Sequence, residues 1–587
     1  MILFLVGHAA AFVVLSASFF AAGRRALPEW KFSCVAEELA VSLGLGAGIW
    51  GTALFALALM GRLGRLEIGC LAVGVQLAAI PVWRDVLRRA RARRGTATSS
   101  SLFFSGGAGI ALLAVPSLVL SLYPPTAFDE TLYHLPIARA LATAHSVGFE
   151  TNLRNPVFPE LVESLHAAML LFFDDSCTHL VEGLALAATA LALYGFGRKW
   201  GSGRAGFLAA AFWVGSPLVV GLGAYALVDL DLTLFFTLAY LAWESGRASG
   251  DRRWLTLAWA FAGFAAATKY LGLWAPLMLA ALTLLFGAGR RGRVRIAAAG
   301  LALSGAVLAL TYGWIFAETR NPVFPFLPRL FGHTEWDKAE FLKSYGEDAS
   351  AWSALWMPWR ISPLWLGALA VAAIGAVRAG RPRRALLAAL AYGIPLLKQD
   401  PRFLLPSLAL LAASAGWSAA GFRYPNPTVP PRRFAAAGTA LAGAILLAPA
   451  YLSAARVWRW IGPVPTSPAA RDAFLRRRVA GYGAVAWLNS RPGPPVRAYF
   501  LFGENLKYFA GGELLGDWSG PWRYGKILPS LRSPRRLDRT LGALGCRYFG
   551  ADLETSRRLS KRAFFPVRFE RVYAGSGWVV WERRGGR

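Results

Sequence analysis

Long apolar runs, repeated from the N-terminus to about residue 455, constrain this chain more than any other feature. The 587 residues are 56% hydrophobic and only 16% charged, which is too apolar for a soluble protein of this length. A run of about 20 apolar residues crosses a bilayer as a helix. The sequence therefore predicts an α-helical polytopic membrane protein. We expect about 14 spans, at residues 2–22, 38–60, 66–83, 101–122, 178–196, 204–223, 229–243, 254–268, 271–287, 297–316, 361–378, 384–397, 403–420 and 434–455.

The positive charges predict how the spans are oriented. With the N-terminus outside and the spans alternating, the inside loops contain 26 Lys and Arg residues, and the outside segments up to residue 455 contain 12. An excess of Lys and Arg marks the cytoplasmic loops of membrane proteins. Membrane orientation therefore accounts for much of the net charge of +30. This distribution favours anionic lipid over nucleic acid as the partner of the basic segments.

This orientation predicts three domains. The last domain contains no spanning run, and short alternating stretches such as Val496–Phe502, between helical patterns, predict strands there. We therefore expect a small extracytoplasmic α/β domain at the C-terminus. The predicted domains are three extra N-terminal spans at 1–100, a membrane domain at 101–455 with long outer loops at 123–177 and 317–360, and the α/β domain at 456–587.

Two adjacent carboxylates follow the predicted span 101–122. Asp129 and Glu130, in the stretch Tyr123–His134, lie where this span opens into water. Carboxylates at a membrane boundary are costly unless they are solvated or paired, so they are candidates for a functional site. The alternative is a solvated loop whose acids cap the following helix.

Three further charged residues fall in short turns between spans at the same outer face. Asp229, Lys269 and Arg402 cannot lie far from the bilayer surface, because the turns that carry them are short. The alternatives are a helix cap for the aspartate, a snorkelling side chain for the lysine and an interfacial anchor for the arginine. A cleft with both signs of charge suits transfer from a lipid-linked phosphate. The cations would offset the charge of the leaving group, and a carboxylate would remove the proton of an acceptor hydroxyl or amine.

One six-residue string occurs twice. Arg-Asn-Pro-Val-Phe-Pro stands at residues 154–159 and again at 320–325. The prolines make each copy stiff and non-helical. The two copies place Arg154 and Arg320 at the predicted outer face, although the repeat is no sign of an internal duplication.

Six strings, in family order over residues 101–420, resemble the membrane glycosyltransferases of the GT-C fold. The resemblance is to the glycosyltransferase family 39-like proteins, near the protein O-mannosyltransferases and the aminoarabinose transferases of lipid A. The chain differs from these relatives in its three extra N-terminal spans, and it lacks the Lys-Pro-Pro-Leu string of the aminoarabinose transferases. The matching strings are Phe128–Ala138, Phe158–Glu163, Val228–Leu230, Ala267–Gly272, Asn321–Leu327 and Arg402–Pro406.

The resemblance implies an inverting transfer of a sugar from a polyprenyl-phosphate donor to an acceptor at the outer membrane face. Asp129 matches the general base, Glu130 matches its acidic neighbour, and Asp229 matches an acid at a later outer turn. The remaining site residues are expected to bind substrate. These are the cationic positions Lys269 and Arg402, the looser match Arg154, and Tyr133, His134 and Arg320.

The partners follow from this function. We expect a polyprenyl-phosphate-linked sugar, membrane lipid, and a glycan, lipid or protein acceptor, in the inner membrane of a bacterium. No cofactor is expected to be required, and the four cysteines have no metal-site or disulfide spacing. An Asp, a Glu and a His at one rim would also suit a divalent metal ion.

Two other functions compete with the transferase. A lipid or sugar transporter would favour interrupted spans and acids at mid-bilayer. A non-catalytic assembly protein would use the domain at 456–587 to bind partners, and its acids could be replaced without loss of function.

Overall fold

The computed structural model describes most of the chain. The described residues are 1–93, 115–287, 289–336, 352–353, 356–357, 360–378, 380–421, 432–517, 520–562 and 564–584. Most of the predicted span 101–122 and part of the outer loop 317–360 lie outside the described residues. Within them, the chain forms a bundle of helices followed by a smaller domain that contains a sheet.

Helices make up nearly all regular structure before residue 462. Apolar side chains from most of these helices meet in one core between them. The longer helices are α1 Ile2–Arg25, α2 Val35–Leu59, α3 Arg65–Ala78, α4 Ile80–Arg93, α8 Leu135–Ala144, α9 Leu161–Phe172, α10 His179–Trp200, α11 Gly203–Val214, α13 Asp229–Ser249, α14 Arg252–Thr268, α15 Trp274–Phe286, α16 Arg290–Thr319, α20 Leu364–Arg378, α21 Gly380–Gly393, α22 Leu405–Gly421 and α23 Arg432–Ile461. The short turns are α7 Val115–Leu120, η1 Glu130–His134, η2 Asp175–Thr178, α12 Pro217–Leu222, η3 Tyr270–Leu273, α17 Pro328–Phe331, η5 Ile394–Leu396 and η6 Pro401–Leu404.

Five helices of the described part are long and apolar enough to cross a membrane, and a bent pair raises the number to six. A polytopic helical membrane protein is thereby confirmed, whereas the number of 14 spans stays a prediction. The five are Ile2–Arg25, Val35–Leu59, Asp175–Trp200, Arg291–Thr319 and Gly438–Ile461.

Two predicted spans are broken where proline interrupts the helix. Helices α3 and α4 meet at 52°, directly before Pro81, in place of one straight span at 66–83. Helices α11 and α12 divide the predicted span 204–223, and Pro217 opens the second of them. Proline cannot donate the backbone hydrogen bond of a helix interior and disfavours helical geometry in the residue before it.

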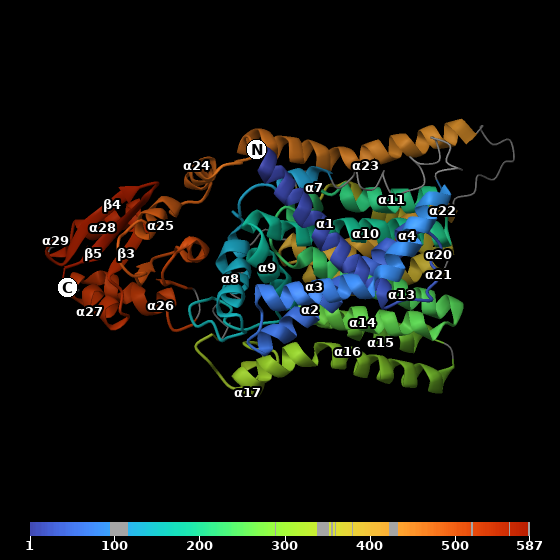
Figure 1. Ribbon diagram of the computed structural model, residues 1–587, viewed down its shortest axis with the longest axis horizontal. Coiled ribbons are helices and arrows are strands. Elements are labelled where there is room, and N and C mark those ends of the chain that lie inside the picture. Colours follow the sequence, from blue (N-terminus) through green and yellow to red (C-terminus); the bar gives the residue numbers. More distant parts are fainter. Residues whose placement is uncertain are drawn as a thin grey trace.

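The bundle has two distinct ends. Figure 1 shows α8, α9 and α17 at the end next to the C-terminal domain, which we call the domain end, and α1 runs from there toward the far end. Helix α1 finishes at the far end in an ion-paired group, where Glu38 on α2 contacts Arg24 at 2.8 Å and Arg89 on α4 at 2.7 Å. On α13, Glu244 pairs with Arg384 at 2.6 Å.

The C-terminal domain contains a five-stranded sheet in its described residues. The strand order is β2-β1-β3-β5-β4, with β1 parallel to β2 and β3, and β5 antiparallel to β3 and β4. The predicted helical bundle with a small C-terminal α/β part is thereby confirmed in outline. The elements are α24 Pro468–Arg478, α25 Tyr482–Asn489, β1 Ala498–Phe500, η7 Glu504–Phe509, β2 Leu514–Leu515, α26 Tyr524–Ile527, η8 Leu528–Arg532, α27 Pro534–Ala543, β3 Tyr548–Asp552, α28 Leu553–Ser560, α29 Phe565–Arg568, β4 Phe569–Gly575 and β5 Trp578–Arg583.

Polar contacts attach this domain to the outer loops of the bundle. Arg139 on α8 donates to the carbonyl oxygens of Tyr508 at 2.5 Å and Ala510 at 2.7 Å. Asp175 accepts from the Tyr508 hydroxyl at 3.0 Å and from Arg471 at 2.5 Å. Because these contacts come from α8 and η2, the domain is seated directly on the segments that follow Asp129 in the chain.

We expect Arg139→Ala to loosen this attachment without unfolding the bundle. The change removes two hydrogen bonds from a charged donor at a partly exposed contact, which stabilise by about 1 kcal/mol. Limited proteolysis of the linker 462–467 should then be roughly fivefold faster, because cleavage follows the population of the opened form. Arg329→Ala on the exposed turn α17 is the matched control. Equal cleavage rates for wild type and Arg139→Ala would show that Arg139 does not help to attach the C-terminal domain to the bundle.

Candidate active site

Four charged side chains from separate parts of the chain meet at the domain end. An Arg402 N–H donates to the Asp129 carboxylate, and another guanidinium nitrogen lies 4.0 Å from Asp229 Oδ2. The Lys269 ammonium donates to Asp229 Oδ1 at 2.8 Å. The four residues form a chain of alternating charge, Asp129–Arg402–Asp229–Lys269, which we call the charge cluster.

The local structure at each position explains how these side chains are presented. Asp229 opens α13, where the helix dipole favours a negative charge. Helix α14 ends at Thr268, and Lys269 continues with extended backbone before η3. Arg402 lies in η6, where the Asp400 side chain accepts from its backbone N–H at 3.0 Å. Each charge therefore stands at a break between helices.

The charge cluster is largely shielded from solvent. The side chains are 2% exposed at Asp229, 13% at Arg402 and 16% at Asp129. Burial alone would raise the pKa of Asp129, but the positive charges of Arg402 and Lys269, with a contribution from Arg154, lower it below its ordinary value. Asp129 is therefore ionised at neutral pH and is held by Arg402.

A cavity of about 450 Å³ lies beside the charge cluster. Lys269 and Arg402 line it, together with the predicted substrate-binding residues Tyr133 and His134. Both copies of the repeated string contribute to its wall, which the sequence did not reveal. They supply Asn155, Val157, Phe158 and Pro159 from the first copy, and Phe324 and Pro325 from the second.

The two ring nitrogens of His134 have different surroundings. Its Nδ1 and Glu163 Oε1 form a hydrogen bond of 2.7 Å, and both side chains are buried. Burial, together with the nearby charge of Lys269, lowers the pKa of His134 well below its ordinary value, so the ring is neutral. Among the described residues its Nε2 has no hydrogen-bond partner. In the neutral tautomer that carries its proton on Nδ1, Nε2 is an acceptor.

Glu130 lies in a different environment from Asp129. Its carboxylate accepts from the backbone N–H groups of Thr126 at 2.9 Å, Ala127 at 3.0 Å and Ala226 at 2.7 Å, and it contacts His179 Nε2 at 2.7 Å. These contacts join the loop before η1 to the loop before α13. They suit a positioning role, and the catalytic role of Glu130 stays a prediction.

The two predicted arginines of the repeat differ in their surroundings. Arg154 is buried, and its charge reaches Asp129. Arg320 is exposed at the C-terminus of α16 and is not among the residues that line the cavity. The structure thus brings Arg154 toward the charge cluster and leaves Arg320 at the surface.

Two residues that support the charge cluster were not predicted from the sequence. Glu182 on α10 accepts from the Leu230 N–H at 3.0 Å and so fixes the start of α13. The aromatic ring of Phe403 lies against both cations: its centroid is 4.7 Å from Lys269 Nζ and 5.2 Å from Arg402 Cζ. A lone acid inside an apolar span is a functional signal and would have identified Glu182, whereas Phe403 stands in the matching string Arg402–Pro406 without a role of its own.

Residues of the types that bind metal ions come together away from the charge cluster. In the described ranges, three His, Cys, Asp or Glu ligand atoms lie within 4.8 Å of one another at His8, Asp174 and Cys177. None of these belongs to the charge cluster. The chemistry that the charge cluster itself can perform is proton acceptance by a carboxylate and stabilisation of an anion by two cations.

Lys269→Met should destabilise the protein, because it leaves the buried Asp229 carboxylate with only the more distant Arg402. Breaking a buried pair from one side costs about 3 kcal/mol. The double variant Lys269→Met/Asp229→Asn should recover part of this loss, and thermal unfolding in detergent measures both. Lys398→Met, at an exposed position in the same region, serves as the control. If the loss of stability in the double variant equals the sum of the losses in Lys269→Met and Asp229→Asn alone, Lys269 and Asp229 are not coupled.

Comparisons with known proteins agree with this geometry. Residues 159–315 match the family model of dolichyl-phosphate-mannose-protein mannosyltransferases, and residues 470–581 match a family described as SF2091/S2213. An uncharacterised protein of Shigella flexneri, SF2093/S2215, is 33% identical over 130 residues, or 22% of this chain. The chain spans 64% of the length of that relative.

Two solved structures share the fold. ArnT from Cupriavidus metallidurans, bound to undecaprenyl phosphate, matches with a TM-score of 0.56 and 16% identity, over 83% of this chain and 98% of ArnT. The oligosaccharyltransferase AglB from Archaeoglobus fulgidus, in complex with an inhibitory peptide and a dolichol-phosphate, matches with a TM-score of 0.50 and 12% identity, over 81% and 74%. The resemblance that the motifs predict is thus confirmed: this chain has the GT-C fold of membrane glycosyltransferases, and its central segment matches the dolichyl-phosphate-mannose-protein mannosyltransferase family.

Proposed function

We propose that this protein is a glycosyltransferase that moves a sugar from a polyprenyl-phosphate donor to an acceptor, with inversion at the anomeric carbon. The observation that carries the proposal is the charge cluster, whose two cations line the 450 Å³ cavity. It combines an ionised carboxylate with two cations at the domain end of a GT-C bundle.

The two cations suit the phosphate of the donor. Arginine presents a planar fork of donors that matches phosphate oxygens, and lysine acts as a point charge. Arg402 and Lys269 both line the cavity, so a phosphate there would contact both. They would stabilise the negative charge that develops as the phosphate leaves. ArnT and AglB were solved with a polyprenyl phosphate and a dolichol-phosphate, which supports the same class of donor here.

In the proposed reaction, Asp129 accepts the proton of the acceptor hydroxyl or amine. The acceptor atom bonds to the anomeric carbon, the bond from that carbon to the phosphate oxygen breaks, and the electron pair leaves with the polyprenyl phosphate. Because the nucleophile enters opposite the leaving group, the configuration inverts. The transfer conserves charge, since one proton moves to Asp129 and one negative charge moves to the phosphate.

Arg402 links donor binding to the activity of the base. In the structure it is bonded to Asp129, which makes that carboxylate a poor proton acceptor. A donor phosphate competes for the same guanidinium. Once Arg402 turns toward the phosphate, Asp129 loses its strongest charge partner and its pKa rises toward the range useful for a base.

The other predicted residues have supporting places in this scheme. Asp229 orients Lys269 and Arg402, and Glu130 positions the loop that carries Asp129. Tyr133 and His134 would contact the sugar, with His134 Nε2 accepting from a hydroxyl. Arg154 adds positive charge near the donor, and Arg320, at the surface, would meet the acceptor or the lipid. Because Arg402 and Lys269 would stabilise the charge of the phosphate, we propose that no metal ion is required.

The proposed location is the inner membrane of a bacterium. The excess of Lys and Arg in the predicted inside loops supports an extracytoplasmic position for the domain end and the C-terminal domain. The acceptor would then be a glycan, lipid or protein of the cell envelope.

Asp129→Asn should abolish transfer while leaving the fold intact. Asparagine keeps the size of the side chain but cannot accept the proton, and loss of a general base lowers the rate by about 100-fold or more. The measurement is transfer from a panel of labelled polyprenyl-phosphate sugars by purified enzyme in lipid. Asp472→Asn, at a partly exposed ion pair of the C-terminal domain, is the matched control. Full activity of Asp129→Asn would exclude Asp129 as the general base.

The pH profile should separate the free enzyme from the donor complex. The pKa of Asp129 is lowered in the free enzyme, so kcat/KM, which reports the free enzyme, should fall only below about pH 4, the ordinary value for Asp. The acid limb of kcat should lie at higher pH, because Arg402 has turned to the phosphate. Acid limbs at the same pH in both parameters would disprove the exchange of Arg402.

A further inference from the structure

Three side chains of the types that bind metal ions meet away from the charge cluster, at the domain end of the bundle. His8 comes from α1, Asp174 from the loop after α9, and Cys177 from η2. One ring nitrogen, one carboxylate oxygen and the sulfur all lie within 4.8 Å of one another. We call these three residues the His–Asp–Cys cluster. They join the first helix of the chain to the start of α10, two segments that are far apart in the sequence.

The imidazole of His8 is oriented so that its second nitrogen can bind a ligand. The side chain is 4% exposed, and Nδ1 lies 2.9 Å from the carbonyl oxygen of Phe4. A carbonyl oxygen can only accept a hydrogen bond, so Nδ1 carries the proton and Nε2 has a free lone pair. Among the described residues, this buried Nε2 has no hydrogen-bond partner. Metal-binding histidines have the same arrangement, because their other ring N–H is donated to a backbone carbonyl or a carboxylate.

The distance from His8 to Asp174 suits two ligands of one ion better than a direct bond. His8 Nε2 lies 3.6 Å from Asp174 Oδ1, which is longer than a hydrogen bond. Around a tetrahedral zinc ion, a histidine nitrogen and a carboxylate oxygen that are each about 2.1 Å from the metal are about 3.4 Å apart. The two atoms are therefore spaced as ligands that share an ion.

Backbone hydrogen bonds fix the carboxylate relative to the thiol. The Asp174 side chain accepts from the backbone N–H groups of Ser176 at 2.9 Å and Cys177 at 3.3 Å. The Cys177 side is closed, since this residue is 1% exposed. The Asp174 side chain is 47% exposed, so an ion would enter from that side. A water molecule would enter there too and complete a four-coordinate site.

We propose that the His–Asp–Cys cluster binds a divalent cation of the zinc type, with water as the fourth ligand. Imidazole nitrogen, thiolate and carboxylate are the ligands that zinc takes in proteins, whereas Mg²⁺ and Ca²⁺ prefer oxygen ligands alone. On binding, the thiol proton of Cys177 is released to solvent and the thiolate bonds to the metal. The ion takes no part in the proposed transfer, because none of its ligands belongs to the charge cluster. This site stands whether or not the proposed function holds.

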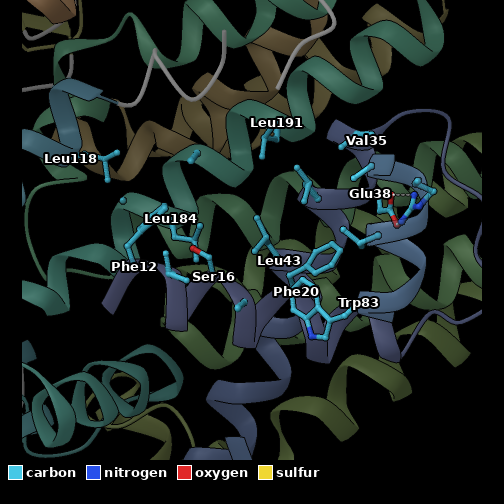
Figure 2. Close-up of a pocket in the computed structure, with 18 residues that line it drawn as sticks. Phe12, Ser16, Phe20, Val35, Glu38, Leu43, Trp83, Leu118, Leu184 and Leu191 are labelled. Atoms are coloured by element: carbon cyan, nitrogen blue, oxygen red, sulfur yellow. Dashed lines mark hydrogen bonds and ion pairs between the residues drawn. The ribbon is translucent and has the colours of Figure 1, made fainter. Parts of the chain in front are cut away.

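The proposed ion would tie α1 to the rest of the bundle. A cavity of about 740 Å³ has walls from both α1 and α10, and Figure 2 shows Phe12 of α1 and Leu184 of α10 among the side chains that line it. His8 lies one helical turn before Phe12, so the ion would join the two helices beside this cavity. The neighbouring Asp175 accepts from Arg471 of the C-terminal domain at 2.5 Å. The ion would therefore fix the same turn on which the C-terminal domain is seated.

The test measures zinc bound to the full protein, purified in detergent through a tag without histidine and dialysed against a zinc buffer. Wild type should bind one zinc ion per chain. His8→Gln/Cys177→Ser should bind zinc at least about 100-fold more weakly, because two of the three protein ligands are lost. The matched control is Cys70→Ser/His145→Gln, in which both changed residues are exposed. This control should bind zinc as wild type does.

Cobalt provides a second measurement, which needs no variant. When Co²⁺ replaces zinc at a tetrahedral site with a cysteine ligand, the absorption spectrum gains a thiolate-to-cobalt charge-transfer band. Wild type should show this band, and Cys177→Ser should lose it. If the double variant does not fold, the wild-type spectrum decides. Less than one zinc ion per wild-type chain, a cobalt spectrum without the thiolate band, or undiminished zinc binding by the folded double variant would each overturn the proposal.

Discussion

The interaction on which the domain end depends is the mutual neutralisation of four buried charges. Each of them alone would be expensive to hold at a membrane boundary, because burial disfavours the charged form. Together, the charges of the two carboxylates and two cations of the charge cluster sum to zero, and hydrogen bonds join Arg402 to Asp129 and Lys269 to Asp229. Three of these charges stand where helical segments begin or end, since Asp229 opens α13, Lys269 follows α14 and Arg402 lies in η6.

The members of the charge cluster could be predicted from the sequence because Asp129 follows an apolar span and the other three are charges in short turns between spans. Few environments can accept such a charge, so its position is informative. The direction of neighbouring side chains was not predictable in the same way. Asp129 and Glu130 are adjacent in the chain, yet one contacts Arg402 and the other binds three backbone N–H groups and His179. Successive residues of a helical turn point in different directions, and only tertiary packing decides which of the two contacts Arg402.

Contacts between distant segments could not be predicted from the sequence either. The two copies of Arg-Asn-Pro-Val-Phe-Pro line one cavity, and the Tyr270 hydroxyl fixes the second copy by donating to the Phe324 carbonyl at 2.7 Å. Identical strings carry no signal of contact, so their meeting follows from the path of the chain alone. The bend at Pro81, by contrast, has a local cause and could have been read from the sequence. Local features such as this bend were thus predictable from backbone chemistry, whereas the meeting of distant segments in one cavity was not.

The zero net charge of the cluster also suggests an order of events. In the proposed reaction, a donor phosphate would bring negative charge to a site whose cations are already paired, so it would bind only if a cation exchanged partners. Arg402 is the cation best placed to do so, because it contacts both acids, whereas Lys269 contacts Asp229 alone. The exchange leaves Asp129 ionised beside added negative charge, which strengthens its attraction for a proton. An acceptor hydroxyl bound at that moment meets a stronger base than the free enzyme contains. Donor binding first and acceptor activation second is therefore the sequence that the electrostatics favour.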